Sequence, residues 1–170
     1  MARISKIDPA TAAPEVRAAI DAHLADGYRL TNEKLTLLHN VTAFNALETQ
    51  SYALDRELQR LVGKRAADFF EYAISLENEC VVCSRYFANL LRRNGIEDFD
   101  RFEFTEEERL LMDYGRAMAR DPKAVPDALF DRLRAAFPEE ALVVITAMGT
   151  LMIANNVFND AMQVEPEKAQ

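Results

Sequence analysis

One apolar segment near the C-terminus limits how the rest of the chain can fold. Pro138 and the two acids that follow it predict the start of a helix that runs from Glu139 to about Gln163. Its first part, from Ala141 to Ala154, is apolar on almost every face, and such a helix must be buried on all sides. We therefore expect a central helix or a subunit interface, with Gly149 letting another helix approach closely.

The remainder of the chain also reads as helical. Only 5 Gly and 6 Pro occur in 170 residues, which disfavours a many-stranded sandwich, and no strand pattern is present. A capping box at Thr105–Glu108 begins one helix, Gly95 ends another, and Thr42 is expected to cap a third. We predict an all-α, compact multi-helix domain that spans residues 1–170. The expected helices are 14–26, 32–39, 42–62, 64–76, 79–93, 105–118, 126–137 and 139–163.

Charge and composition narrow the possible partners and location. The formal net charge is −8, and short basic groups at Lys64-Arg65 and Arg92-Arg93 form no basic stripe, so we expect neither nucleic acid nor an anionic membrane as partner. The N-terminus lacks the apolar stretch of a signal peptide, and the longest apolar run is shorter than the ~20 residues of a membrane span. These features predict a soluble, cytoplasmic protein.

The two cysteines, Cys80 and Cys83, lie near the start of the predicted helix 79–93. Residues three apart are neighbours on one helix face, so a disulfide can form with little backbone movement. The helix N-terminus favours a thiolate, which makes the sulfur nucleophilic. The alternatives are two buried cysteines that fall three apart by chance, or a metal site. Structural zinc needs four Cys or His ligands, and only the distant His23 and His39 are available, so we expect no metal and no cofactor.

A polar stripe upstream supplies candidate proton acceptors. Asp68, Glu71 and Ser75 share one face of the otherwise apolar helix 64–76. One interpretation is a plain solvent face. The other is that this face turns inward, where a carboxylate takes a proton from a thiol and desolvation raises the carboxylate's pKa toward that task.

These elements together resemble a known family. The segment from Lys64 to Ile96, the Leu37–Asn40 element and the Asn156–Ala161 element are similar to the carboxymuconolactone decarboxylase and alkylhydroperoxidase D-like superfamily, over residues 12–166. The resemblance implies an all-α fold assembled into dimers, trimers or hexamers. It also implies that the cysteine pair reduces organic hydroperoxides and that a thiol donor then reduces the pair again.

Carried over residue by residue, the resemblance makes Cys80 and Cys83 the redox pair, in which one sulfur attacks the peroxide and the other resolves the sulfenic acid to a disulfide. The family pattern favours Cys83 as the attacking sulfur, whereas placement at a helix end favours Cys80. The family's glutamate lies twelve residues before the first cysteine, where this chain has Asp68, and Glu71 lies one helical turn later.

Two apolar residues depart from the family pattern. Phe87 stands where the family has a proton-relay histidine, and Val82 occupies a position that is histidine in some members. Both would raise the thiol pKa by desolvation. The relay is then reduced to a carboxylate, with Tyr86 or Tyr72 as possible helpers.

Two histidines and two asparagines complete the set of candidate residues. His39 is expected to pack with a hydrogen bond on a leucine-rich helix rather than act in catalysis, and His23 is expected to be exposed. Asn156, with its neighbour Asn159, either satisfies the end of a buried helix or donates a hydrogen bond into the cysteine pocket.

The leading prediction is a thiol-dependent hydroperoxide reductase. Its substrate would be a small organic hydroperoxide, its reductant a lipoyl or thioredoxin-like protein, and its assembly a homo-oligomer. Two alternatives remain. A carboxymuconolactone decarboxylase-like enzyme would need acid–base groups and no cysteine pair. A non-enzymatic redox sensor or scaffold is kept open by the missing relay histidine.

Overall fold

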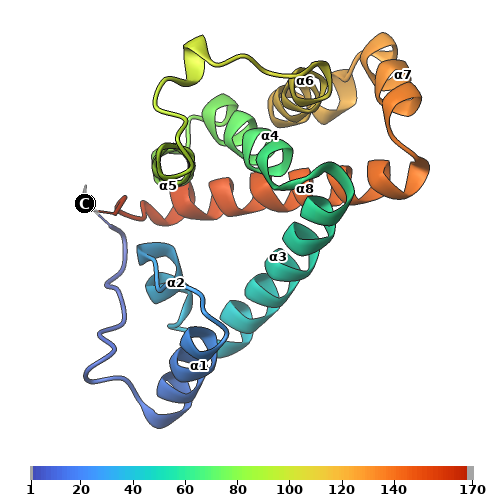
Figure 1. Cartoon of the computed structure of the whole chain (residues 1–170). Coiled ribbons are helices and arrows are strands. Elements are labelled where there is room, and N and C mark those ends of the chain that lie inside the picture. The colour runs from blue at the N-terminus through green and yellow to red at the C-terminus, as the bar shows by residue number, and fades with distance from the viewer. Residues whose placement is uncertain (1, 168–170) are drawn as a thin grey trace.

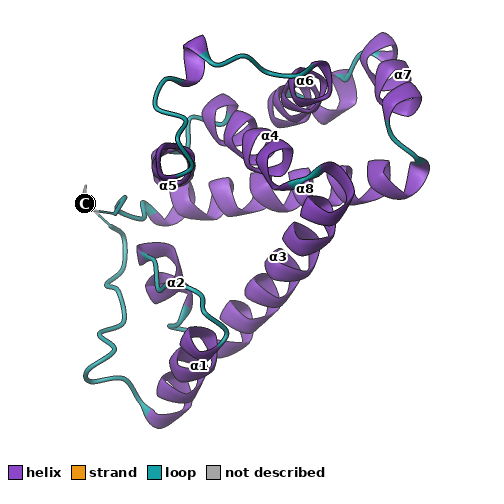
Figure 2. Cartoon of the chain, viewed as in Figure 1, coloured by secondary structure: helices purple, strands orange, loops and turns teal. Residues whose placement is uncertain are grey.

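The computed structural model describes residues 2–167, and within that range the chain is helical with no strand (Figures 1 and 2), which confirms the all-α prediction. Short 3₁₀ turns lie at Phe99–Arg101 and Pro122–Ala124. The α-helices are α1 (Pro14–Ala25), α2 (Asn32–Leu37), α3 (Val41–Val62), α4 (Lys64–Glu77), α5 (Val81–Arg93), α6 (Glu106–Arg120), α7 (Asp127–Ala136) and α8 (Glu139–Met162).

Two of the three helix ends predicted from capping residues are confirmed. Thr105 Oγ1 accepts the Glu108 N–H at 3.1 Å, and the Glu108 carboxylate accepts the Thr105 N–H at 2.8 Å, which completes the predicted capping box. Gly95 has a positive φ of 82° after α5, as expected. The prediction of Thr42 as a cap is wrong, because Asn40 caps α3 by accepting the Ala43 N–H at 2.9 Å.

Helix α8 is the central element (Figure 1), and α3, α4, α5, α6 and α7 all pack against it. Gly149 lets α4 approach closely, because a Cβ at this position would lie 2.9 Å from Phe70 Cζ. The helix is not buried on all sides, since Val143 and Val157 remain exposed. By length and composition alone α8 could cross a membrane, which is weak evidence because a core helix of a soluble protein passes the same test; in this structure α3 and α4 pack against it.

The N-terminal helices form a second packing centre on the first half of α3. Ile20, Leu38 and Phe44 are buried there, and Phe158 of α8 packs against the same cluster. Segments close to both termini hold α2 in place, because the Ile7 N–H donates to Leu35 O, and the Asn32 amide donates to Glu165 O. As a result, α2 lies near the C-terminal half of α8, on the opposite side of that helix from α5 in the view of Figure 1.

Candidate functional site

A tight reversal between α4 and α5 places the first cysteine. The Cys80 N–H donates to Ser75 O and the Glu79 N–H donates to Leu76 O, both at 3.1 Å, which is the hydrogen-bond pattern of a Schellman motif. Glu79 occupies the left-handed position with φ of 56°, where glycine is usual, at a cost of roughly 1–2 kcal/mol. Helix α5 then begins at Val81 with Cys80 as its N-cap, two residues later than predicted.

Both cysteines are free thiols and both are buried. Cys80 Sγ accepts the Cys83 N–H at 3.5 Å, so the first sulfur caps the helix. Cys83 Sγ accepts a hydrogen bond from Asn159 Nδ2 of α8 at 3.2 Å. Phe87, at the position of the family's relay histidine, is buried in the same apolar cluster as the two sulfurs. The pair therefore lies in a largely apolar site with one amide donor beside it.

The two sulfurs differ in acidity. The pKa of Cys80 is lowered, chiefly because the Cys83 thiol donates a hydrogen bond to it, and burial opposes this effect. The pKa of Cys83 is raised by that same hydrogen bond, by burial and by the nearby negative charge of Glu33. This asymmetry favours Cys80 as the resting thiolate, as its placement at the helix end suggests; which cysteine attacks stays a prediction.

The polar stripe on α4 faces inward and not toward solvent. Asp68 and Glu71 are almost fully buried and Ser75 is completely buried. Lys64 donates to both Asp68 carboxylate oxygens at 2.9 and 2.7 Å, yet burial still raises the pKa of Asp68. Burial raises the pKa of Glu71 well above its usual range, and the charges of Asp55 and Asp68 add to this effect.

No hydrogen bond in the described part of the chain joins Asp68 or Glu71 to a sulfur. Glu71 Oε1 is buried without a hydrogen-bond partner, as far as residues 2–167 are concerned. Burial raises the pKa of the Tyr86 phenol on α5, and the negative charge of Glu71 raises it further. Asp68, Glu71 and Tyr86 are called the acidic patch below, and within residues 2–167 none of them hydrogen-bonds to a sulfur.

The other secondary candidates lie apart from the sulfurs. The Tyr72 ring packs edge-on against Phe99 at a centroid distance of 4.8 Å. His39 is exposed beyond the end of α2, so the predicted packing on that helix is wrong, whereas the predicted hydrogen bond is present, with Nε2 2.7 Å from Ser5 O. Asn156 is buried and donates to Asn78 Oδ1 at 3.0 Å, which fastens α8 to the reversal before Cys80.

The prediction of an exposed His23 is also wrong. Its ring is buried where α1 packs on α3, with Nε2 3.1 Å from Arg29 O and Nδ1 3.5 Å from the Glu48 carboxylate. Each histidine ring therefore lies within hydrogen-bond distance of a backbone carbonyl, Arg29 O for His23 and Ser5 O for His39. In residues 2–167, no group of three or more His, Cys, Asp or Glu side chains is arranged to hold a metal ion. The absence of a metal or cofactor stays a prediction.

Sequence analysis missed one acidic residue of the site. Glu33 of α2 lies beside the Asn159 amide, which donates a hydrogen bond to its carboxylate. Burial raises the pKa of Glu33 to about 7, the charge of Glu48 also raises it, and the hydrogen bond from Asn159 lowers it. Nothing in the sequence singles out Glu33, because only the docking of α2 against α8 brings it near a cysteine fifty residues away.

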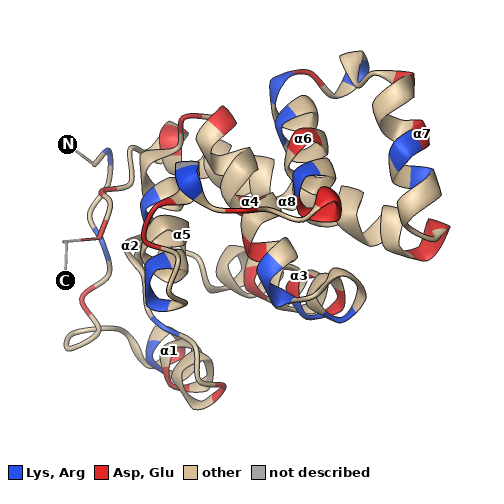
Figure 3. Cartoon of the chain, turned by 45° about the horizontal axis from the view of Figure 1, so that its top comes forward, with Lys and Arg blue, Asp and Glu red and all other residues tan. Residues whose placement is uncertain are grey.

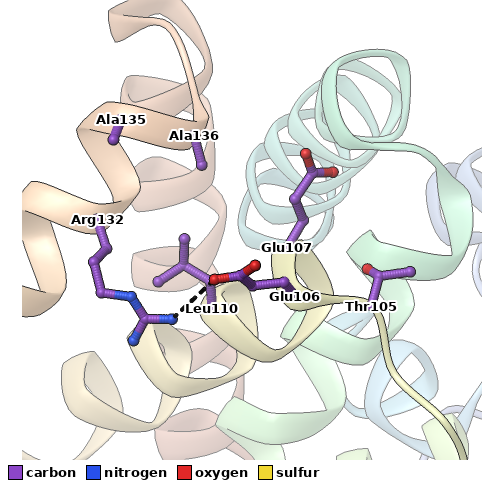
Figure 4. A pocket seen from close by; sticks show the side chains of 7 residues that line it. All are labelled: Thr105, Glu106, Glu107, Leu110, Arg132, Ala135 and Ala136. Atoms are coloured by element: carbon purple, nitrogen blue, oxygen red, sulfur yellow. Dashed lines mark ion pairs between the residues drawn. The ribbon is translucent and has the colours of Figure 1, made fainter.

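Two surface grooves lie away from the cysteines. One groove, of about 540 Å³, lies between the start of α6 and α7. At this groove Arg132 Nη2 lies 4.0 Å from Glu106 Oε1 (Figure 4). Another, of about 590 Å³, includes Tyr114 and Phe130. Neither groove contains a cysteine or a residue of the acidic patch. In Figure 3, basic and acidic residues are interspersed along the helices.

In the comparison with known proteins, the sequence matches over part of the chain and the structure matches over nearly all of it. No protein-family profile matches the chain. It is 41% identical to YnjA of Escherichia coli strain K12 over 61 residues, which are 36% of this chain and about a third (34%) of the length of YnjA. A peroxidase-related protein from Ralstonia eutropha JMP134, described as an alkylhydroperoxidase AhpD core, superposes with a TM-score of 0.78 at 19% identity, over 98% of this chain and 93% of that protein.

A second solved structure is a cysteine-to-alanine variant of the debrominase Bmp8 in complex with 2,3,4-tribromopyrrole. It superposes with a TM-score of 0.80 at 18% identity, over 98% of this chain and 94% of the debrominase. These likenesses establish the fold. The chain adopts the alkylhydroperoxidase D-like fold, as the resemblance in residues 64–96 predicted. Proteins with this fold include a peroxidase-related protein and a debrominase.

Proposed function

We propose that the protein is a thiol-dependent hydroperoxide reductase of the alkylhydroperoxidase D-like superfamily. The observation that carries this proposal is the pair of free, adjacent thiols at the start of α5, in which Cys83 donates hydrogen bonds to the Cys80 sulfur from its thiol and its backbone. This arrangement stabilises one thiolate and keeps a second thiol beside it. It is the arrangement that a dithiol needs to cycle to a disulfide.

The reaction proceeds in two balanced steps. The Cys80 thiolate attacks the terminal oxygen of the hydroperoxide, the O–O bond breaks, and the alkoxide leaves with a proton as the alcohol, so that Cys80 becomes a sulfenic acid. The Cys83 sulfur then loses its proton and attacks the Cys80 sulfur. The S–O bond breaks, hydroxide leaves with a proton as water, and the disulfide forms. A dithiol donor, such as a lipoyl or thioredoxin-like protein, reduces the disulfide again.

The acidic patch supplies the first of these protons in the proposal. Burial raises the pKa of Glu71 well above its usual range, which favours the protonated form and makes Glu71 the proton donor of this proposal. Tyr86 is half exposed and its phenol is within electrostatic reach of Glu71, so it is the second candidate for proton exchange with solvent. Phe87 makes no contribution to proton transfer, so we expect slower turnover than in relatives with a histidine at its position.

The predictions about substrate, assembly, location and partners are also part of this proposal. The substrate is a small organic hydroperoxide, because the sulfurs lie in an apolar site with a few polar groups beside them. The protein acts as a homo-oligomer in the cytoplasm, without nucleic acid or membrane as a partner. The exposed Val143 and Val157 on α8 supply apolar surface that a second copy can cover.

Turnover of cumene hydroperoxide with dihydrolipoamide as donor tests the proposal. The wild type is compared with Cys80→Ser and Cys83→Ser, and with Val81→Ser, which changes an exposed residue of the same motif and keeps both thiols. We expect both cysteine variants to lose turnover and Val81→Ser to retain it. Equal turnover in all four proteins would refute the thiol mechanism.

A disulfide that forms reversibly without turnover would favour a redox switch, which the buried Phe87 in place of a relay histidine makes the second candidate. Because the debrominase Bmp8 shares the fold, a brominated pyrrole belongs in the same assay as a second substrate.

A further inference from the structure

We propose that Asn159 of α8 is a catalytic residue whose side-chain amide stabilises the negative charge on the Cys83 sulfur while the disulfide forms. The inference rests on the proposed function and assigns a group to its second step. In that step the Cys83 thiol loses its proton as its sulfur attacks the Cys80 sulfenic acid, so negative charge develops on Cys83 Sγ. A donor that is already directed at this atom lowers the barrier, because its hydrogen bond strengthens as the charge grows.

The contact between the amide and the sulfur carries the inference. Asn159 Nδ2 lies 3.2 Å from Cys83 Sγ, and both residues are buried. Within residues 2–167, this amide is the one hydrogen-bond donor to that sulfur. Phe87, at the position of the family's relay histidine, supplies no donor and belongs to the same apolar cluster as the sulfur. In such an environment a hydrogen bond to a charged atom is stronger than it is in water.

The orientation of the amide matches the sulfur. The hydrogen of the Cys83 thiol is directed to the Cys80 sulfur, so Cys83 Sγ presents lone pairs to α8, and a donor is the group that pairs with them. Asn159 Oδ1, in contrast, is buried without a hydrogen-bond partner in the described part of the chain. An apolar side chain of the same size would spare the fold this unpaired oxygen. The hydrogen bonding of Asn159 is therefore made by its nitrogen, on the side of the sulfur.

The fold holds Asn159 in place from both sides. One turn earlier on α8, Asn156 donates to Asn78 Oδ1 at 3.0 Å and fastens the helix to the reversal before α5. After Asn159, the Val164 N–H donates to the Asn159 carbonyl oxygen at 2.9 Å and closes the end of α8. The amide is therefore directed at the sulfur before the reaction begins, and it does not have to reorient as the charge develops.

The surroundings of Cys83 otherwise oppose the thiolate. Its hydrogen bond to the Cys80 sulfur, burial and the negative charge of Glu33 all raise the pKa of Cys83, whereas the hydrogen bond from Asn159 lowers it. Oxidation of Cys80 to a neutral sulfenic acid removes the first of these effects, and burial remains. The amide is thus the group that favours the thiolate of Cys83 at the moment when that thiolate is needed.

The step balances without a further reagent. The Cys83 sulfur forms the S–S bond with Cys80 Sγ, the S–O bond of the sulfenic acid breaks, and the Cys83 proton leaves with the hydroxide as water. Asn159 gains and loses no proton. Its N–H bonds stay intact, and it acts only on the charge of the sulfur.

The rate of Cys83 alkylation tests this role without any peroxide. Iodoacetamide modification is followed between about pH 6 and 10 in Cys80→Ser, alone and combined with Asn159→Leu or Asn159→Asp. Asn155→Leu, at a half-buried position of the same helix, is the matched control. Asn159→Leu should slow alkylation near pH 8 by about tenfold, because the thiolate loses its donor. Asn159→Asp keeps the size of the side chain and replaces the donor by an acceptor, so it should slow alkylation at least as much.

The direction of the change separates a catalytic from a structural role. If Asn159 only filled space, its replacement would loosen the site and speed alkylation. Profiles of the two Asn159 variants that are faster than their parent, or superimposed on it, would overturn the inference. Asn155→Leu should superimpose on the parent. Circular dichroism shows which variants are folded, and Asn159→Asp decides if the leucine variant is not.

A second measurement addresses the reaction and separates the two proposals. In the protein with both cysteines, Asn159→Leu should slow disulfide formation by at least about tenfold and leave the first consumption of hydroperoxide unchanged, so that dimedone traps more Cys80 sulfenic acid. Unchanged disulfide formation would overturn the role of Asn159 in the second step. If the wild type shows no cysteine-dependent turnover, the proposed function fails, whereas the alkylation profile still decides whether Asn159 stabilises the Cys83 thiolate.

Discussion

The buried carboxyl group of Glu71 makes the stability of the protein depend on pH in a specific direction. Its pKa in the folded state lies above its unfolded value, because burial penalises the ionised form. The folded state therefore binds more protons than the unfolded chain above about pH 4.5, and this contribution to the free energy of unfolding falls as pH rises. It is fully present below the unfolded pKa and is lost as pH passes through the folded pKa.

Replacement of Glu71 by Gln removes this contribution. Glu71→Gln should match the wild type in stability near pH 4.5, since one buried oxygen of Glu71 already has no partner within residues 2–167. The variant should then gain relative to the wild type by up to about 1.4 kcal/mol for each pH unit, until the folded pKa is reached.

Urea unfolding under reducing conditions at pH 4.5, 6.0 and 7.5 (roughly one and a half units apart) measures this difference at a spacing that resolves the expected slope. Glu107→Gln on the surface of α6 is the matched control and should show no such trend. A stability difference between wild type and Glu71→Gln that stays constant over this pH range would refute the assignment of Glu71 as a neutral buried acid.

Two further predictions concern packing and thiol acidity. Gly149→Ala should lower the free energy of unfolding by about 1–2 kcal/mol, because overpacking against Phe70 outweighs the gain in helix propensity; urea unfolding checks this, with the exposed Thr150→Ala as control, and an unchanged midpoint would contradict it. Brief alkylation of the reduced wild type at pH 7 should label Cys80 before Cys83, because the pKa of Cys80 is lowered and that of Cys83 is raised. Peptide mass spectrometry decides the order, and preferential labelling of Cys83 would reverse the assignment of the thiolate.

Local chemistry explains which parts of the fold were predictable. The capping box at Thr105, the positive φ of Gly95 and the close approach at Gly149 each depend on residue type and on neighbours in the sequence, and all three are present. The cap of α3 was misplaced because Asn40 and Thr42 are both good N-cap residues, and the sequence does not say which one has extended backbone.

The site itself was predictable only in its local part. The cysteine pair and the grouping of Asp68, Glu71 and Ser75 on one face of α4 follow from spacing on single helices, but the inward direction of that face does not. The surroundings of His23 and Glu33 depend on how α1 and α2 dock on the rest of the fold. Docking of this kind is decided by the shapes of apolar faces, which a single sequence does not reveal. Asn159 was recognised only as one of two possibilities with Asn156, because both lie on the same helix and only one of them hydrogen-bonds to a sulfur.

A single-turnover reaction of the reduced protein with hydroperoxide tests the central claim most directly. One equivalent of cumene hydroperoxide is mixed with the reduced wild type, and the products are analysed by intact and peptide mass spectrometry. The proposed mechanism predicts one cumyl alcohol per chain, with loss of both thiol hydrogens and a Cys80–Cys83 disulfide. Unreacted hydroperoxide with both thiols still reduced would contradict it.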